Sequence, residues 1–267
     1  MLQQSLNVTI VQAPLVWADK AANLDYFTRK LKHLQVSTDL IVLPEMFTTG
    51  FITDPEQISE TMDGQVMQWM AQTSARLNCV ITGSIAMKEW NCYFNRLIWM
   101  RPDGTFEKYD KHHLFRMGNE DKRFTQGLGS LIVDLKGWKI KPLVCYDLRF
   151  PVWSKNTLVN NKYEYDILIY VANWPASRSY AWQTLLSARA IENQAYCIGV
   201  NRIGDDGKGI PHVGGSVILD FKGKLLSGCE DKQPDIVTHT IDYESLNSYR
   251  ERFKVALDWD DFTVSGK

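Results

Sequence analysis

Residues 167–175 read Ile-Leu-Ile-Tyr-Val-Ala-Asn-Trp-Pro, six apolar residues that stop abruptly at a polar side chain. The apolar run, Ile167–Ala172, is the longest in the chain and falls far short of the roughly 20 residues that span a bilayer. An unbroken run of this kind is typical of a strand that is covered on both faces of an α/β sheet. A helix of about three turns is predicted soon after it, marked by Trp182, Leu185, Leu186, Arg189 and Ile191.

Two other apolar runs end in the same way. Leu40–Leu43 runs into Pro44-Glu45, and Pro142–Val144 runs into Cys145-Tyr-Asp-Leu-Arg. In α/β proteins, ligands bind beyond the carboxyl ends of strands, where side chains converge. We therefore expect Glu45, Cys145 and the Asn173-Trp174 pair to line one shared pocket.

Short strand patterns alternate with longer helical patterns along the whole chain. Hairpins are predicted around the turn residues Pro102-Asp-Gly104 and Lys136-Gly137. Asp19 is the expected N-cap of a first helix, and Tyr243–Phe253 is a predicted last helix. Roughly ten to twelve strands and about five helices predict two packed sheets with helices outside. We expect one α/β domain over residues 1–267.

The composition excludes several classes of protein. The chain has 267 residues, of which 45% are hydrophobic and 23% charged, as is typical of a globular protein. Its net charge of −1 gives no reason to expect binding to nucleic acid or to an anionic membrane. Five scattered cysteines do not resemble a disulfide framework, and no Lys or Arg precedes Lys20 as in a signal peptide. We therefore expect a cytoplasmic protein.

Glu45 and Cys145 are candidate catalytic residues. A carboxylate at a strand end can be solvated or can cap a turn, but Pro44 stiffens the approach and the next residues are too apolar for an ordinary exposed loop. Such surroundings suit a general base. A free cysteine is usually a small buried hydrophobe, which is our interpretation of Cys79 and Cys197. Cys145 differs because it stands where a predicted strand ends. At such a strand-to-helix elbow, the side chain of a nucleophile is exposed and backbone N–H groups lie beside it.

Lys111 follows a predicted strand within Tyr-Asp-Lys-His-His-Leu-Phe, residues 109–115. Most lysines are surface charges, but this one has His-His and then Leu-Phe beside it. Zinc is the alternative for His112 and His113. Adjacent side chains on an extended chain point to opposite faces, and no Cys or carboxylate completes a standard ligand spacing. The glycine-rich segment 204–209 has neither phosphate-loop nor dinucleotide spacing, so we interpret it as a flexible loop. With neither a metal-ligand spacing nor a nucleotide-binding spacing in the sequence, we expect no metal and no cofactor.

Taken together, Leu-Pro-Glu45-Met-Phe, the Lys111 segment and Leu-Val-Cys145-Tyr-Asp-Leu-Arg-Phe-Pro resemble the three signatures of the nitrilase, or carbon–nitrogen hydrolase, superfamily. They occur in the family's order, at its usual separations of 66 and 34 residues. The resemblance covers nearly the whole chain. Within the superfamily the sequence is most similar to bacterial omega-amidases, through Phe150–Trp153 and Arg189–Gln194 among other segments.

The resemblance implies a fold, an assembly and four catalytic residues. Members of the family form an αββα sandwich and usually dimerise into an extended four-layer core, so we expect a homodimer. Carried over by position, Cys145 is the nucleophile, Glu45 the general base and Lys111 the electrostatic stabiliser. Glu120 stands seven residues before Gly127 and fits the family's second glutamate. Its role is either to orient Lys111 or to share in proton handling.

The activity implied by the resemblance is the release of ammonia from omega-amides of short dicarboxylic acids, such as 2-oxoglutaramate and 2-oxosuccinamate. We expect Glu45 to take the thiol proton as Cys145 attacks, and a thioester to remain once ammonia has left. The oxyanion would lie between the Lys111 ammonium and the backbone N–H of Tyr146.

Such a substrate carries a distal carboxylate, which requires a cation in the pocket. Arg149 and Arg178 are the candidates, and a structural ion pair is the alternative for each. Asn173 is expected beside them, and Trp174 as an apolar wall.

Three alternatives stay open at this point. Another nitrilase-superfamily amidase, carbamoylase or nitrilase would use the same Glu-Lys-Cys set. A catalytically idle binding module would retain the pocket. A papain-like peptidase is disfavoured, because no His-bearing segment resembles its partner motif.

Overall fold

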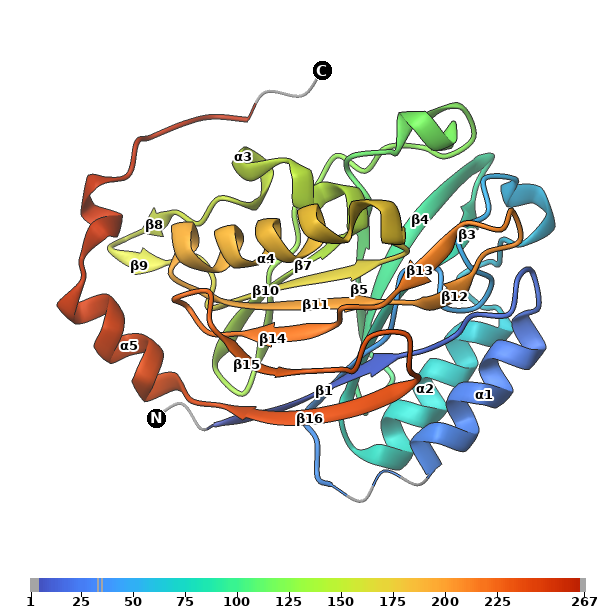
Figure 1. The fold of residues 1–267 in the computed structure, drawn as a ribbon, viewed down its shortest axis with the longest axis horizontal. Helices are drawn as coiled ribbons and strands as arrows, with labels where there is room; N and C mark the ends of the chain where they lie inside the picture. Colours follow the sequence, from blue (N-terminus) through green and yellow to red (C-terminus); the bar gives the residue numbers. More distant parts are fainter. Residues whose placement is uncertain (1–4, 33, 35, 265–267) are drawn as a thin grey trace.

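The computed structural model describes residues 5–32, 34 and 36–264, and in it two six-stranded sheets are stacked with helices on their outer faces (Figure 1). The first sheet contains, in spatial order, β16 (Asp235–Ile241), β1 (Leu6–Gln12), β2 (Leu40–Val42), β3 (Val80–Glu89), β4 (Cys92–Met100) and β5 (Phe106–Asp110). The second contains β15 (Leu225–Gly228), β14 (Val217–Leu219), β11 (Tyr196–Asn201), β10 (Ile167–Ala172), β7 (Trp138–Val144) and β6 (Val133–Leu135).

Helices cover the outer face of each sheet. Two helices lie along the first sheet, α1 (Lys20–Lys32) and α2 (Gln65–Leu77) (Figure 1). Two others lie on the side of the second sheet, α3 (Pro151–Ser154) and α4 (Ser179–Asn193), and α5 (Tyr243–Arg252) follows β16. The arrangement is the αββα sandwich that the sequence predicts. None of the helices in the described ranges has the length and apolar character needed to cross a membrane.

Strand alternation explains the layers. Successive side chains of a strand point to opposite faces, and in β2 both faces are buried. Leu40 and Val42 belong to the apolar core that contains residues of both sheets. Ile41 and Leu43 belong instead to the core beneath α1 and α2, together with Phe27. An unbroken apolar run is therefore required here, because neither face meets water.

A glycine allows α4 to approach the second sheet closely. A Cβ atom built on Gly199 of β11 would lie 2.4 Å from Leu186 Cδ1 and 2.8 Å from Trp182 Cζ2. Both side chains belong to α4, so any larger residue at this position would push the helix away. The helix therefore packs directly on β11, the strand that follows it in the chain.

The local predictions hold for the longer elements. Asp19 Oδ1 accepts the N–H of Ala22 at 2.9 Å and caps α1, and the turn at Pro102-Asp-Gly104 joins β4 to β5. The expected number of strands is too low, since the described residues contain sixteen. The additional ones are two-residue to four-residue strands with no apolar pattern of their own, β8 (Leu158–Val159), β9 (Lys162–Tyr163), β12 (Ile203–Asp205), β13 (Pro211–Val213) and β15.

Candidate active site

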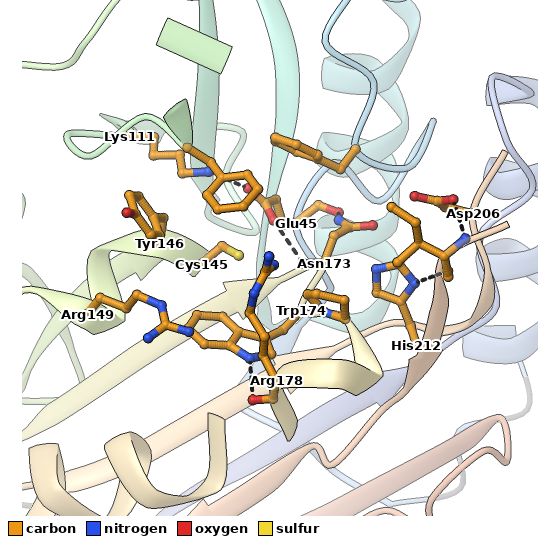
Figure 2. A pocket seen from close by; sticks show the side chains of 14 residues that line it. Glu45, Lys111, Cys145, Tyr146, Arg149, Asn173, Trp174, Arg178, Asp206 and His212 are labelled. Atoms are coloured by element: carbon orange, nitrogen blue, oxygen red, sulfur yellow. Dashed lines mark hydrogen bonds and ion pairs between the residues drawn. The ribbon is translucent and has the colours of Figure 1, made fainter. Parts of the chain in front are cut away.

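A pocket with about 600 Å³ of empty space opens where four strands end (Figure 2). Glu45 follows β2 and Lys111 follows β5, both in the first sheet. Cys145 follows β7 and Asn173 follows β10, both in the second sheet. All four line the pocket, so it lies where the two sheets meet.

Cys145 stands on a strained turn. The chain leaves β7 in an extended conformation at Val144, and Cys145 then adopts a left-handed φ of 42° at the start of a short 3₁₀ helix, Cys145–Arg149. Such a conformation costs a non-glycine residue about 1–3 kcal/mol and persists only where surrounding contacts impose it. The elbow turns the partly exposed thiol into the pocket, as Figure 2 shows.

A buried cluster of charges faces the thiol. Lys111 Nζ lies 2.9 Å from Glu45 Oε1 and 2.9 Å from Glu120 Oε2, and none of the three side chains is exposed to solvent. Asn95 Nδ2 donates to Glu45 Oε1 at 2.8 Å and to Glu120 Oε1 at 3.1 Å. The amide therefore connects the two carboxylates on the side away from the ammonium.

Backbone groups complete the environment of both carboxylates. The N–H of Asn173 donates to Glu45 Oε2 at 2.8 Å, and the N–H of Phe115 donates to Glu120 Oε2 at 2.6 Å. Glu45 is thus neither solvated nor a turn cap. Its Oε1 accepts from Lys111 and Asn95, whereas its Oε2 accepts from the backbone N–H of Asn173.

The pKa values of the cluster favour a neutral thiol beside a charged lysine. Burial would lower the pKa of Lys111, but the charges of Glu120 and Glu45 outweigh it and raise the pKa above its ordinary value. Burial raises the pKa of Cys145 well above its ordinary value, and the Glu45 charge adds to this against the opposing effect of Lys111. Burial also raises the pKa of Glu120, although Lys111 opposes it.

Two arginines face the same pocket without a carboxylate partner. The Arg149 guanidinium lies 4.8 Å from the centre of the Trp174 ring, and that of Arg178 lies 5.4 Å from the Phe115 ring. Within the described part of the chain neither forms an ion pair. The structure therefore does not show the structural ion pairs that were the alternative role for these arginines. Arg189 does form one, with Glu192 at 2.8 Å, and belongs to the scaffold.

Several pocket residues escaped the sequence analysis. Asp206, Ile210 and His212 reach the pocket from the hairpin of β12 and β13, whose turn is the glycine-rich segment that we interpreted as a flexible loop. His212 lines the pocket, and its Nδ1 donates to the carbonyl of Ile210 at 2.9 Å. Asn95 was also missed. An amide between the aromatic residues and the apolar end of strand β4 was the available signal, because a buried amide needs partners.

The two adjacent histidines do not point to opposite faces. Their ring centroids are 4.6 Å apart, because the chain bends directly after Lys111 and is no longer extended there. His112 stacks on Trp153 and His113 on Phe150. Across the described ranges, no group of three or more His, Cys, Asp or Glu side chains is arranged to hold a metal ion.

Comparison with known proteins agrees with this geometry. The family model described as "Carbon-nitrogen hydrolase" matches residues 7–251. The chain is 45% identical over 260 residues to a protein named "Omega-amidase YafV" from Yersinia enterocolitica, covering 97% of this chain and 99% of that protein. It is 28% identical to a "2-oxoglutaramate amidase" from Bacillus subtilis, covering 87% of this chain and 88% of that protein.

Solved structures place the fold in the same group. The crystal structure of XC1258 from Xanthomonas campestris, described as a CN-hydrolase superfamily protein with an arsenic adduct in the active site, superimposes with a TM-score of 0.95. The two chains are 43% identical, and the match covers 98% of this chain and 100% of that one.

Proposed function

Because the chain belongs to the carbon–nitrogen hydrolase family and is a hydrolase that acts on amides, we propose that it releases ammonia from omega-amides of short dicarboxylic 2-oxo acids. 2-Oxoglutaramate and 2-oxosuccinamate are the candidate substrates. The observation that carries this choice is that two guanidinium groups, Arg149 and Arg178, face the pocket that holds Cys145 and form no ion pair with any described residue. The names of the relatives from Yersinia enterocolitica and Bacillus subtilis support it.

In the proposed reaction, Cys145 Sγ attacks the amide carbonyl and its proton passes to Glu45. We assign the proton to Oε2, because Oε1 already accepts from Lys111 and Asn95. Taking the proton during the attack avoids forming a free thiolate beside a carboxylate, which the raised pKa of Cys145 makes costly. Glu45 then gives the proton to the departing nitrogen, the C–N bond breaks, and ammonia leaves a thioester behind.

The tetrahedral oxyanion needs positive charge and N–H donors. Lys111 supplies the charge, since its pKa is raised and it stays an ammonium group. The backbone N–H of Tyr146 directly follows the nucleophile and is the proposed second donor. In the second half of the reaction Glu45 activates a water molecule, which attacks the thioester carbon and releases the acid and the Cys145 thiol.

Glu120 fits a positioning role better than a proton-carrying one. Its two oxygens accept four contacts, two from Lys111 and one each from Asn95 and the Phe115 N–H. A proton could enter only by displacing one of these donors. We therefore propose that Glu120 orients Lys111 and leaves proton transfer to Glu45.

Arg149 and Arg178 are the proposed ligands of the substrate's distal carboxylate, because guanidinium groups bind carboxylates with directed hydrogen bonds. Trp174 is the proposed apolar wall beneath Arg149, and Asn173 fixes Glu45 at the opposite side. We further propose that residues 1–267 form one catalytic domain, that the protein is cytoplasmic, and that it is a homodimer, as the family resemblance implies. Light scattering of the purified protein tests the proposed dimer.

Ammonia release from 2-oxoglutaramate, compared with glutamine, asparagine, a simple nitrile and an N-carbamoyl acid, tests the substrate proposal. We expect turnover of the 2-oxo acid amide to exceed that of the others. Faster turnover of the nitrile or of the carbamoyl acid, the latter with carbon dioxide release, would assign the chain to another branch of the family.

The Cys145→Ala variant tests the covalent mechanism. It should fold normally and release no ammonia, because the acceptor of the acyl group is gone. Wild-type protein quenched during turnover should show the acyl adduct on the Cys145 peptide by mass spectrometry. Near-normal turnover by Cys145→Ala would rule out the thioester.

A further inference from the structure

A buried carboxylate outside the pocket lining connects two of the chain segments that supply the pocket. Asp147 Oδ2 accepts the N–H of Val144 at 3.0 Å and the hydroxyl of Tyr109 at 2.8 Å. Its Oδ1 accepts the backbone N–H of His113 at 3.0 Å and the same residue's Nδ1 at 2.9 Å. The side chain is fully buried, so these four donors replace its hydration.

The donors belong to the chain on either side of the catalytic groups. Tyr109 and His113 lie two residues before and after Lys111, whereas Val144 directly precedes Cys145. Tyr109 lies in β5 of the first sheet and His113 follows that strand, whereas Val144 is the last residue of β7 in the second sheet. Asp147 is therefore a direct polar link between the sheets at the edge where the pocket opens.

We infer that Asp147 is a positioning residue for the reaction proposed above: by binding both segments it holds the Cys145 elbow in register with Lys111. The inference rests on the proposed function for its catalytic consequence. Reaction geometry is sensitive to such links, because a displacement of about 1 Å can cost roughly 10²-fold in rate. The left-handed φ of Cys145 also requires such a restraint, since a strained turn relaxes when its restraints are removed.

The groups that bind Asp147 suit a fixed restraint. In the described part of the chain no lysine or arginine pairs with Asp147, and His113 is its one ionisable nitrogen partner. Burial and the Asp147 carboxylate raise the pKa of Tyr109 well above its ordinary value, so the hydroxyl stays protonated and donates. Tyr109 in turn accepts from Trp153 Nε1 at 2.9 Å and from the His112 N–H at 3.2 Å. The restraint thus extends over both histidines that follow Lys111.

Two variants break the link to different extents. In Asp147→Asn one oxygen becomes an NH₂ group, and either orientation of the amide sets it against a backbone N–H, of Val144 or of His113. Tyr109→Phe removes a single hydroxyl and leaves the ring in place, so it retains the fold even if Asp147→Asn does not. We expect kcat to fall roughly 10-fold to 100-fold in Asp147→Asn and less in Tyr109→Phe, with KM within about twofold of wild type.

Alkylation of Cys145 by iodoacetamide, followed peptide by peptide with mass spectrometry, gives a readout that does not depend on turnover. The charged and titratable groups that line the pocket with Cys145 are Glu45, Lys111, Tyr146, Arg149, Arg178, Asp206 and His212. Burial and the Glu45 charge are the two largest causes of the raised pKa of Cys145. Release of the elbow weakens both, because it admits water and separates the thiol from Glu45. The pH midpoint of Cys145 alkylation should therefore fall in both variants while kcat also falls. Exposed Cys92 is the internal reference, and its profile should not change.

Asp166→Asn is the matched control. Asp166 is also a buried carboxylate, but it binds Arg250 Nη1 at 2.6 Å and lies outside the pocket lining. This variant should lose stability and keep both the kcat and the Cys145 midpoint of wild type.

Folded Asp147→Asn and Tyr109→Phe proteins with wild-type kcat and midpoint would overturn the inference, as would equal changes in Asp166→Asn. If wild-type protein hydrolyses none of the amides tested, the proposed function fails, and the alkylation midpoints still decide whether Asp147 positions the thiol.

Discussion

Glu45 and Lys111 lie 66 positions apart in the sequence, yet Glu45 Oε1 and Lys111 Nζ are 2.9 Å apart in an ion pair with no exposed surface. A buried ion pair contributes little net stability, because desolvating both charges offsets their attraction. Removing one partner is different, since the other charge then stays buried without compensation. Substitution of either member is therefore expected to cost far more stability than the intact pair contributes.

Lys111→Met removes the ammonium group and leaves Glu45 and Glu120 buried without a cation. We expect a loss of about 3–5 kcal/mol in the free energy of unfolding at neutral pH and a fall in kcat of roughly 10²-fold to 10³-fold. Without Lys111, the pKa of Glu120 in the folded state rises further above its value in the unfolded state. Glu120 then ionises at lower pH in the unfolded state than in the folded state, so the loss of stability grows as the pH rises. Denaturant titrations at several pH values and steady-state kinetics measure both effects.

Lys141→Met is the control for that variant, because Lys141 is also buried but lies beside Tyr165 and outside the pocket lining. It should retain the wild-type kcat. A Lys111→Met enzyme that turns over normally would remove the lysine from the mechanism.

Glu45→Gln retains the size of the side chain and removes its charge. We expect kcat to fall about 10²-fold to 10⁴-fold, because the thiol loses its proton acceptor, while KM changes little. The Glu45 charge raises the pKa of Cys145, so the alkylation midpoint of Cys145 should move to lower pH in this variant.

Glu60→Gln is a suitable comparison for Glu45→Gln, since Glu60 pairs with Lys20 away from the pocket lining. A change mainly in KM for Glu45→Gln would assign Glu45 to substrate binding instead of proton transfer.

Arg149→Ala and Arg178→Ala test recognition of the substrate carboxylate. A hydrogen bond to a charged group contributes about 1.5–3 kcal/mol, so we expect KM for 2-oxoglutaramate to rise roughly 10-fold to 100-fold in whichever variant loses the carboxylate ligand. A neutral amide such as butyramide should show no matching change. Arg116→Ala serves as the control because Arg116 is exposed and pairs with Asp121. Equal effects on charged and neutral amides would contradict a carboxylate site.

Alkaline pH should destabilise the fold through its buried thiols. Burial raises the pKa of Cys79 to about 12, and burial likewise raises the pKa of Cys197. A folded-state pKa above the unfolded value of about 8.5 means that the unfolded state releases its proton first. Stability is therefore unaffected below about pH 8.5 and falls above it, by about 1.4 kcal/mol per pH unit for each thiol.

Urea denaturation under reducing conditions between pH 8 and 10 measures that loss. Cys79→Ala should reduce the slope of stability against pH, whereas substitution of exposed Cys92 should leave it unchanged. A flat profile across this range would contradict the burial of the two thiols.

Much of the architecture follows from local patterns. Ile167–Ala172 and Leu40–Val42 are unbroken apolar runs and form strands that are covered on both faces. Turn chemistry at Pro102-Asp-Gly104 is sufficient to place a hairpin. Strands of two or three residues, such as β8 and β12, carry too few side chains for any periodicity and depend on their neighbours for pairing.

Some pocket residues could likewise be predicted from the sequence, and others could not. Glu45 and Cys145 were identifiable because each stands directly after an apolar run, in a setting that an ordinary loop does not provide. Asn95 and His212 gave no comparable signal. Asn95 contacts Glu45, 50 positions away in the chain, and His212 lines the pocket together with residues from distant segments.

The amino-acid sequence by itself therefore determined the longer strands, the longer helices and the side chains that end those strands, since these depend on the preferences of neighbouring residues. Only the tertiary structure decided which strand ends face one another, that Arg149 and Arg178 have no acidic partner in the described chain, and that Asp147 joins the Cys145 and Lys111 segments. These features depend on how two separate sheets stack, and that packing is set by the whole apolar core at once and by no single stretch of residues.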